Sequence, residues 1–212
     1  MRYSSIQESQ DDHIKRYRTD GFLKGKGTRY SPDYHRVKFL LDNTPKESYV
    51  LDVGCNTGTV AIPLTQLGCY VKGIDIVPEL VEKAIRRGIP AEIGTAENLS
   101  RFDDNEFDVV ICAEVLEHLY DPLPAIQEAY RVLKPGGKYL VTIPHSNSLM
   151  AGDKLGDYHQ QNFSMEILDT LFYCVFERGK VFFVEIPYID EYCKANGVPK
   201  GMYAWFGLEC LK

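Results

Sequence analysis

The sequence contains no apolar run that approaches the roughly 20 residues a membrane-spanning helix needs. Its opening residues lack the apolar stretch of a secretory signal. Its six cysteines include no C-x-x-C pair, which argues against a disulfide framework and against a zinc knuckle. These absences, with 44% hydrophobic and 25% charged residues in a chain of 212, predict a globular, cytoplasmic protein with one main domain.

Positive charge is outnumbered by negative charge outside one segment. The chain carries −6 overall, whereas residues 13–38 hold eight Lys or Arg against two Asp, a local balance of +6 that leaves −12 for the remainder. An acidic body disfavours nucleic acid as a partner. The basic segment is interleaved with Tyr17, Phe22, Tyr30 and Tyr34. It can be interpreted as a grip on an anionic ligand or RNA, or as a solvated helix anchored by its aromatic rings.

Strand-like and helix-like patterns alternate from residue 49 onward. Residues 50–53 and 109–112 are apolar on both faces, as strands covered by helices on two sides must be. Alternation at this spacing predicts βαβ units and a mostly parallel sheet. We expect strands over residues 49–54, 70–76, 91–95, 107–113, 138–144, 180–187 and 203–211, helices over 34–41, 59–67, 78–88, 114–119, 122–133 and 164–176, and a turn at 134–137.

The run VLDVGCNTG, residues 50–58, is the most informative segment. Asp52 lies near the end of an apolar strand, and two glycines four residues apart then let the backbone turn sharply. An open α/β sheet binds nucleotide-like ligands at such a place. The pyrophosphate fingerprint G-x-G-x-x-G is incomplete, because Asn56 and Thr59 stand where its later glycines belong. The loop therefore suits a ligand with a positive amine better than one with phosphates, and an ordinary strand-to-helix turn remains the alternative.

Polar residues also follow the later strands. Asp75, at the end of the second expected strand, can accept hydrogen bonds from both hydroxyls of a ribose. The turn at residues 96–98, with sequence Ala-Glu-Asn, can line an adenine ring. Glu114, Glu117 and His118 crowd the tip of the fourth expected strand. Together these positions favour a nucleoside ligand at one edge of the sheet.

In order, the segments VLDVGCNTG, GIDI, GTAENL, FDVVICAEVLEHL and LKPGGKYLVTIP resemble the motifs of the class I methyltransferases that use S-adenosylmethionine. Over residues 49–176 the chain is most similar to the small-molecule branch that includes ubiquinone- and menaquinone-pathway enzymes. The resemblance implies an α/β fold with a Rossmann-like, seven-stranded, mostly parallel sheet and helices on both faces. Its last strand, residues 203–211, would run antiparallel between its neighbours. It also implies S-adenosylmethionine as cofactor and methyl transfer to oxygen, nitrogen or carbon of a small molecule.

The same resemblance implies cofactor contacts at positions that match the family's motifs. Asparagine at the loop position where the family often has glycine is a mild departure, because it tolerates a left-handed backbone. The methionine end of the cofactor would meet Asp52, Gly54, Cys55, Asn56 and Gly58, the ribose Asp75, the adenine Ile76, Ala96 and Glu97, and the sulfonium Ala113 and Glu114.

Methyl transfer from a sulfonium depends mainly on alignment, and an oxygen or nitrogen nucleophile can also need a base. His118, His145 and His159 follow expected strands on the cofactor edge and are the candidates for that base. A structural role is the alternative for each histidine, most of all for His118, which falls inside an expected helix. For the acceptor we expect contacts from Tyr30, Tyr34 and Tyr158.

Three other functions are open to the sequence. Glu114, Glu117, His118 and His159 resemble the ligand set of metal-dependent enzymes that methylate the 3′ end of small RNAs. The acidic body argues against that function, and we expect catalysis without a metal. A non-catalytic scaffold that binds the cofactor is the second alternative. A nicotinamide dehydrogenase, the third, is disfavoured by the missing glycine.

The segment before the first strand is expected to be a separate unit. We assign residues 1–42 to an N-terminal arm and residues 43–212 to the methyltransferase domain. In related methyltransferases the corresponding region folds over the cofactor, and we expect this arm to act as a lid. No membrane span and no nucleic acid partner are expected, and the protein would be a monomer or a homodimer.

Overall fold

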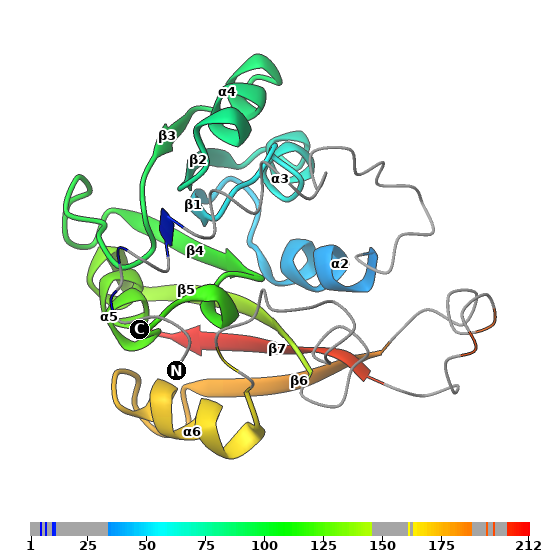
Figure 1. Cartoon of the computed structure of the whole chain (residues 1–212), viewed down its shortest axis with the longest axis vertical. Coiled ribbons are helices and arrows are strands. Elements are labelled where there is room, and N and C mark those ends of the chain that lie inside the picture. The colour runs from blue at the N-terminus through cyan, green and yellow to red at the C-terminus, as the bar shows by residue number, and fades with distance from the viewer. Residues whose placement is uncertain are drawn as a thin grey trace.

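The computed structural model of the protein describes residues 5, 7, 10, 11, 34–145, 161, 163–187, 194, 197 and 203–212. Seven strands among these residues form one sheet. The strands are β1 (Tyr49–Val53), β2 (Tyr70–Asp75), β3 (Ala91–Ile93), β4 (Phe107–Ala113), β5 (Leu133–Pro144), β6 (Val181–Pro187) and β7 (Tyr203–Leu211). Their order across the sheet is β3-β2-β1-β4-β5-β7-β6, as Figure 1 shows. The pairs among β1 to β5 are parallel, whereas β7 runs antiparallel to both β5 and β6. The predicted fold class and the antiparallel last strand are confirmed.

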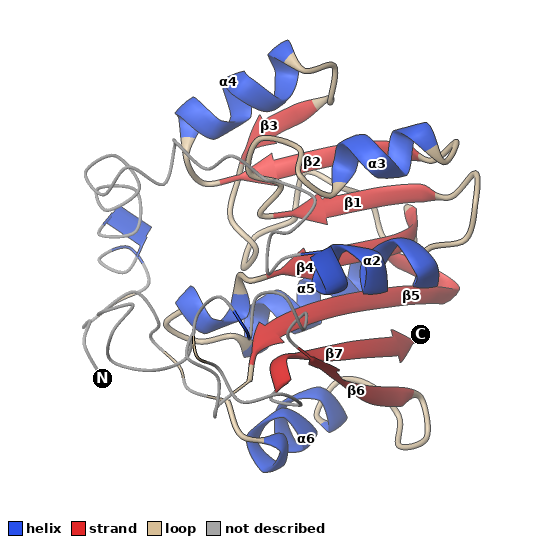
Figure 2. Cartoon of the chain, turned by 90° about the vertical axis from the view of Figure 1, so that its right-hand side faces the viewer, coloured by secondary structure: helices blue, strands red, loops and turns tan. Residues whose placement is uncertain are grey.

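Helices cover both faces of the sheet (Figure 2). They are α2 (Tyr34–Asn43), α3 (Ala61–Gln66), α4 (Pro78–Arg86), α5 (Leu123–Val132), α6 (Met165–Tyr173) and the short 3-10 helix η2 (Leu116–His118). Residues from α2, α3 and α4 share one apolar cluster with β1, β2 and β4, and residues from α5 and α6 share another with β4, β5 and β7. The central strands are therefore buried on both faces, which explains why their sequences are apolar throughout.

Several helix boundaries follow from local chemistry. Pro63 lies in the first turn of α3, where a backbone N–H would have no helical acceptor, so the helix begins later than the sequence pattern indicated. Gly88 follows α4 with φ +87°, a conformation that favours glycine at a helix end. Ser164 precedes α6 and its side chain accepts a hydrogen bond from the backbone N–H of Ile167.

Two predicted elements are wrong in detail. The helix expected over residues 114–119 is reduced to η2, because Glu114 has φ +57° and ends the regular backbone there. The turn expected at residues 134–137 lies within β5, where the register with β4 shifts between Phe107 and Val109. Lys134 to Gly137 thus bulge out of the ladder instead of preceding the strand.

Within the described ranges, no helix has the length and apolar character that crossing a membrane requires.

Candidate functional site

A pocket opens at the carboxyl ends of the parallel strands, where the sequence predicted a ligand. Its wall combines Gly54 after β1, Asp75 and Ile76 at the end of β2, and residues 94–97 after β3. The segment after β4 adds Glu114, Val115, His118 and Leu119. Six of the predicted cofactor contacts therefore line one pocket: Gly54, Asp75, Ile76, Ala96, Glu97 and Glu114.

The charge of this pocket is negative. Asp75, Glu97 and Glu114 line it, and the described lining residues include neither lysine nor arginine. His118 is the one histidine among those described lining residues. Such a wall attracts a cationic ligand and repels phosphates.

The loop at residues 54–58 offers no spare backbone donor. The N–H groups of Gly54 and Cys55 both donate to the Ile74 carbonyl, at 2.8 and 2.9 Å. The N–H groups of the next three residues donate to the Asp75 carboxylate, the Asn56 side-chain oxygen and the Cys55 carbonyl, respectively. A phosphate at this loop would therefore find no free N–H group, unlike a phosphate at a dinucleotide-binding turn. This finding supports the prediction that a dinucleotide fits poorly.

Glycine is required where the loop meets the pocket. Gly54 has φ +74°, and a Cβ atom there would lie 2.3 Å from Cγ2 of Val115. Asn56 has φ +50°, in the left-handed region that asparagine was expected to tolerate. The Cys55 side chain is buried beneath β2, where a Cβ at Gly73 would lie 2.7 Å from its Sγ. Cys55 therefore shapes the loop from inside, and burial raises the pKa of its thiol.

Asp75 joins the loop to the end of β2. Its two carboxylate oxygens accept hydrogen bonds from the backbone N–H groups of Asn56, at 2.8 Å, and Val77, at 2.9 Å. The carboxylate is buried, and this burial raises its pKa even though the backbone donors act in the opposite direction. A carboxylate offers about four acceptor positions, so Asp75 can hold the loop and still accept from a ligand hydroxyl.

Asp52 lies below the pocket rather than in its wall. Its side chain is 2% exposed, and among the described residues its Oδ2 atom has no hydrogen-bond partner. Burial, with the nearby Asp75 carboxylate, raises the pKa of Asp52 from 3.8 to about 7, against the influence of Arg36. Arg36 of α2 is itself buried, although the sequence analysis had not selected it. The charge of this guanidinium also acts on Glu117, which places Arg36 close to the acidic edge of the sheet.

Stability should depend on pH through Asp52. Because the folded state raises this pKa from 3.8 to about 7, the neutral carboxyl is favoured by folding, and its contribution is lost as the pH rises through that window. Asp52→Asn keeps the neutral form at every pH. We expect the free energy of unfolding of Asp52→Asn to exceed that of the wild type by on the order of 4 kcal/mol at pH 8 and to differ by less than about 1 kcal/mol near pH 4. Urea unfolding at both pH values tests this; parallel pH profiles would contradict it.

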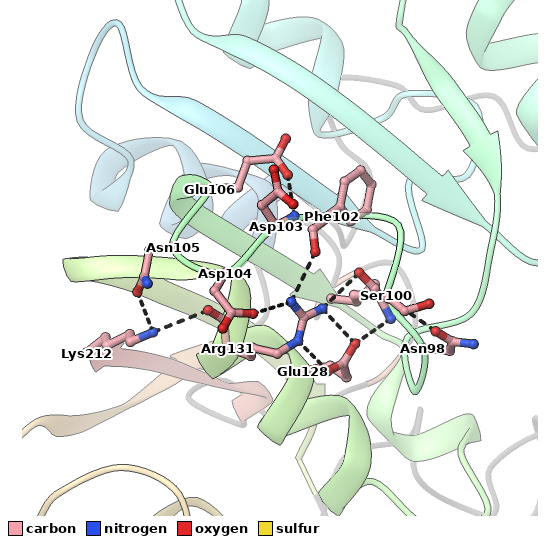
Figure 3. A network of polar contacts seen from close by, with 11 residues as sticks. Asn98, Ser100, Phe102, Asp103, Asp104, Asn105, Glu106, Glu128, Arg131 and Lys212 are labelled. Atoms are coloured by element: carbon pink, nitrogen blue, oxygen red, sulfur yellow. Dashed lines mark hydrogen bonds and ion pairs between the residues drawn. The ribbon is translucent and has the colours of Figure 1, made fainter.

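The turn after β3 is held from both ends. Gly94 donates its N–H to the Asp75 carbonyl at 3.0 Å. At the other end, the Leu99 N–H donates to Glu128 at 2.7 Å, while the Leu99 carbonyl accepts from Arg131 at 2.9 Å. Arg131 also donates to the Phe102 carbonyl and to Asp104, and it pairs with Glu128 at 2.7 Å (Figure 3). Glu128 and Arg131 of α5 therefore fix residues 99–104, the segment that follows the pocket wall. The sequence analysis had selected neither residue.

Loss of the Arg131 side chain should destabilise the fold substantially. Arg131→Ala removes hydrogen bonds to two carbonyls and two carboxylates, and we expect the free energy of unfolding to fall by about 3 kcal/mol. Arg86→Ala is the control, because Arg86 has an exposed pair with Glu82 at 3.5 Å, and it should cost less than about 0.5 kcal/mol. Urea denaturation of both variants measures the difference. Equal stabilities would show that the network in Figure 3 contributes little.

Two neighbouring glutamates after β4 differ in environment. Glu114 lines the pocket, and its Oε2 atom accepts a hydrogen bond from Nε1 of Trp205 at 2.9 Å. Glu117 is 1% exposed, and neither of its carboxylate oxygens has a hydrogen-bond partner among the described residues. Burial, with Glu114 close by, raises the pKa of Glu117 well above its ordinary value. Burial therefore favours the protonated form of the Glu117 carboxyl.

The predicted histidines lie in different surroundings. His118 lines the pocket, with Nε2 3.9 Å from the Glu117 carboxylate. His145 is buried at the end of β5, where its ring packs against Phe206 and its Nε2 lies 3.3 Å from Glu185. His145 is not among the residues that line the pocket. The geometry therefore brings His118, which the sequence marked as the most structural of the three, closer to a ligand than His145.

Other predicted positions lie outside the wall or outside the described residues. Ala113, Asn56 and Gly58 neighbour the pocket without lining it. Tyr30, Tyr158 and His159 are outside the described residues, as is the side chain of Tyr34. Among the described residues, no group of three or more His, Cys, Asp and Glu side chains is arranged to hold a metal ion. The roles assigned to all of these positions stay predictions.

Residues 51–141 match a protein family described as "Methyltransferase domain". Among similar curated proteins, the ubiquinone biosynthesis O-methyltransferase of Xanthomonas oryzae pv. oryzae is 38% identical over 99 residues, which cover 44% of this chain and 41% of that protein. The enzyme of the same name from Xylella fastidiosa is 35% identical over 99 residues, 44% of this chain and 40% of that protein. The match thus spans about two fifths of the length of these relatives.

Solved structures share the fold across nearly the whole chain. A SAM-dependent methyltransferase from Thermotoga maritima has a TM-score of 0.70 at 23% identity, covering 98% of this chain and 100% of that one. An S-adenosylmethionine-dependent methyltransferase from Mesorhizobium loti has a TM-score of 0.70 at 14% identity, with 86% and 98% covered. The cyclase SpnF reaches 0.72 at 17% identity, with 98% and 96% covered, so the fold by itself does not fix the reaction.

The matched residues 51–141 contain the six predicted cofactor positions that line the pocket at the carboxyl ends of the parallel strands. Residues 51–141 are thus similar to a methyltransferase domain and to part of the ubiquinone biosynthesis O-methyltransferases, and the chain shares the fold of the solved methyltransferase structures.

Proposed function

We propose that this protein binds S-adenosylmethionine and transfers its methyl group to a small-molecule acceptor. The observation that carries the proposal is the charge of the pocket, which is lined by Asp75, Glu97 and Glu114 and, among described residues, by no lysine or arginine. S-adenosylmethionine presents a sulfonium and an ammonium group, both positive. The backbone N–H groups of residues 54–58 add support, because all five already donate hydrogen bonds within the protein and are not available to the phosphates of a nucleotide.

The pocket supports a distinct role for each wall. Asp75 has acceptor capacity left for ribose hydroxyls, and the turn that carries Ala96 and Glu97 is fixed well enough to line an adenine. Gly54 has no side chain, so the ligand can approach the main chain there. Any side chain at this position would also meet Val115. Arg36, buried close to Asp52 and Glu117, is our candidate for binding the carboxylate of the methionine end.

The bound cofactor would supply a methyl group on an activated leaving group. The protein then has to align the acceptor and exclude water, which provides most of the rate. Among the described histidines, we propose His118 as the group that takes a proton from an acceptor, and its position in the pocket wall supports this. His145, held by Glu185, and His159 remain further candidates for that base.

The acceptor is proposed to be a small molecule with an oxygen nucleophile. The support is the similarity to ubiquinone biosynthesis O-methyltransferases, and the acidic composition of the chain does not suit RNA. A cytoplasmic location and a monomeric or homodimeric state remain predictions.

Titration calorimetry with S-adenosylhomocysteine and with NAD tests cofactor binding. We expect heat of binding with the first and none with the second. Incubation with isotope-labelled S-adenosylmethionine and a metabolite extract, followed by mass spectrometry, should then reveal one labelled small molecule. Binding of NAD without binding of S-adenosylhomocysteine would overturn the proposal, and cofactor binding without any labelled product would favour the scaffold alternative.

The arm at residues 1–42 is proposed to be a lid over this pocket. Gln10 lines the pocket and its side chain bonds to Glu97, which supports contact between the arm and the cofactor side. We expect S-adenosylhomocysteine to protect the Lys24 to Arg29 region, which lies outside the described residues, from limited trypsin digestion. Equal cleavage with and without the ligand would leave the arm as a tail.

A further inference from the structure

The loop at residues 54–58 is held by the part of the chain that follows it. Its first two N–H groups donate to the Ile74 carbonyl of β2, and a third donates to the Asp75 carboxylate. A further contact comes from the residue directly after α4, where Nη1 of Arg87 donates to the Thr57 carbonyl at 2.6 Å. The same nitrogen lies 3.1 Å from the Thr57 hydroxyl oxygen. β2 and the end of α4 therefore bond to separate points of the loop.

The chain after α4 also packs against the end of the loop. Gly88 has φ +87° and turns the chain, and the buried Ile89 side chain then lies beside Gly58. A Cβ atom at Gly58 would be 3.1 Å from Cγ1 of Ile89. Arg87 and Ile89 thus contact neighbouring loop residues, the first through a hydrogen bond and the second through apolar packing.

The Thr57 peptide depends on side chains for its hydrogen bonds. The carbonyls of Cys55 and Gly58 accept from backbone N–H groups, whereas the Thr57 carbonyl accepts from the Arg87 guanidinium. The Thr57 N–H donates to the side-chain oxygen of Asn56 at 2.7 Å. Asn56 itself has φ +50°, a costly conformation for a residue with a side chain, which persists where surrounding contacts impose it. A charged donor at the next carbonyl is such a contact.

We propose that Arg87 is a positioning residue for the cofactor, because it holds the Thr57 peptide and so maintains the loop shape that presents Gly54 to the ligand. This inference rests on the proposed function. The described residues that line the pocket include Gly54 but not Arg87, so Arg87 acts through the loop. Without its bond, a smaller fraction of the molecules has the loop shape that binds, and the apparent affinity falls by that fraction.

Titration calorimetry with S-adenosylhomocysteine tests the role of Arg87. Arg87→Ala should weaken binding about fivefold, a modest effect because Arg87 is exposed and water can replace part of its bond. Arg87→Lys keeps a positive donor and should bind within about twofold of the wild type. Arg86→Ala is the matched control, since Arg86 is the adjacent arginine but pairs with Glu82 of its own helix, and its affinity should be unchanged.

Amide hydrogen exchange without ligand reports on the loop itself. In Arg87→Ala the N–H groups of Thr57 and Gly58 should exchange at least about threefold faster than in the wild type, and in Arg86→Ala at the same rate. Urea unfolding of each variant identifies a general loss of stability, which a purely structural residue would also cause.

Three outcomes would overturn the inference: wild-type affinity in Arg87→Ala, lower stability of that variant with unchanged affinity, or an equal loss of affinity in Arg86→Ala. Weaker binding with faster exchange confined to the loop, both reversed in Arg87→Lys, would support it. Absence of S-adenosylhomocysteine binding to the wild type would instead overturn the proposed function.

Discussion

Replacing Gly54 with alanine is expected to lower the affinity for S-adenosylhomocysteine by at least about 100-fold. The new Cβ would lie 2.3 Å from Cγ2 of Val115, a distance at which one of the two must move. Val115 is β-branched and lines the pocket, so its displacement would reshape the wall that meets the ligand. The φ of +74° adds backbone strain for any residue with a side chain. Calorimetry with S-adenosylhomocysteine measures the loss.

Gly88→Ala is the matched control for Gly54→Ala. Gly88 has φ +87°, but no heavy atom lies within 4 Å of a Cβ built there. The control variant should therefore lose about 1 kcal/mol of folding free energy through backbone strain and should keep its ligand affinity. If Gly54→Ala bound S-adenosylhomocysteine as well as Gly88→Ala does, the loop after β1 would not be part of the binding site.

Asp75→Ala is expected to weaken binding of S-adenosylmethionine and S-adenosylhomocysteine at least severalfold, and also to destabilise the fold. The backbone N–H groups of Asn56 and Val77 would lose their acceptor, each at a cost of about 1–3 kcal/mol before compensation. The ribose would lose the acceptor that we assign to it. Both effects act on the same loop, so calorimetry must be combined with urea unfolding.

Asp108→Ala separates these two effects. Asp108 also accepts a backbone N–H, from Tyr49 at 2.8 Å, and pairs with Lys134 at 2.7 Å, but at the amino ends of β1 and β4. Its loss should reduce stability and leave ligand affinity unchanged. Unchanged binding in Asp75→Ala would remove the ribose role, and weakened binding in Asp108→Ala would show that instability alone explains the effect.

The sequence located most of the fold because its signals are local. Apolar runs of strand length, Gly88 after a helix and Pro63 near the start of another follow from propensities that need no distant partner. The antiparallel course of β7 came from the family resemblance, since periodicity cannot give strand direction. The helix expected at Glu114 was wrong because contacts to Thr142 and Trp205, distant in sequence, decide the backbone there.

The candidate site was predicted where its residues sit directly after strands. Gly54, Asp75 and Glu114 follow β1, β2 and β4, and parallel strands bring their carboxyl ends to one edge. The positions that the analysis missed act across the fold. Glu128 and Arg131 resemble an ordinary surface pair three residues apart on a helix, and only the folded chain shows them bracketing the Leu99 peptide.

The sequence by itself determined which residues reach the sheet edge, because strand spacing and the break after each strand are local properties. The tertiary structure alone decided which of these residues share a pocket, how deeply each is buried and which hydrogen-bond partner each has. It buried Asp52 below the wall, directed His145 toward Glu185, and set the Glu114 carboxylate against Trp205. The physical reason is that burial and hydrogen-bond partners arise between strands far apart in the chain, and these partners fix both pKa and direction.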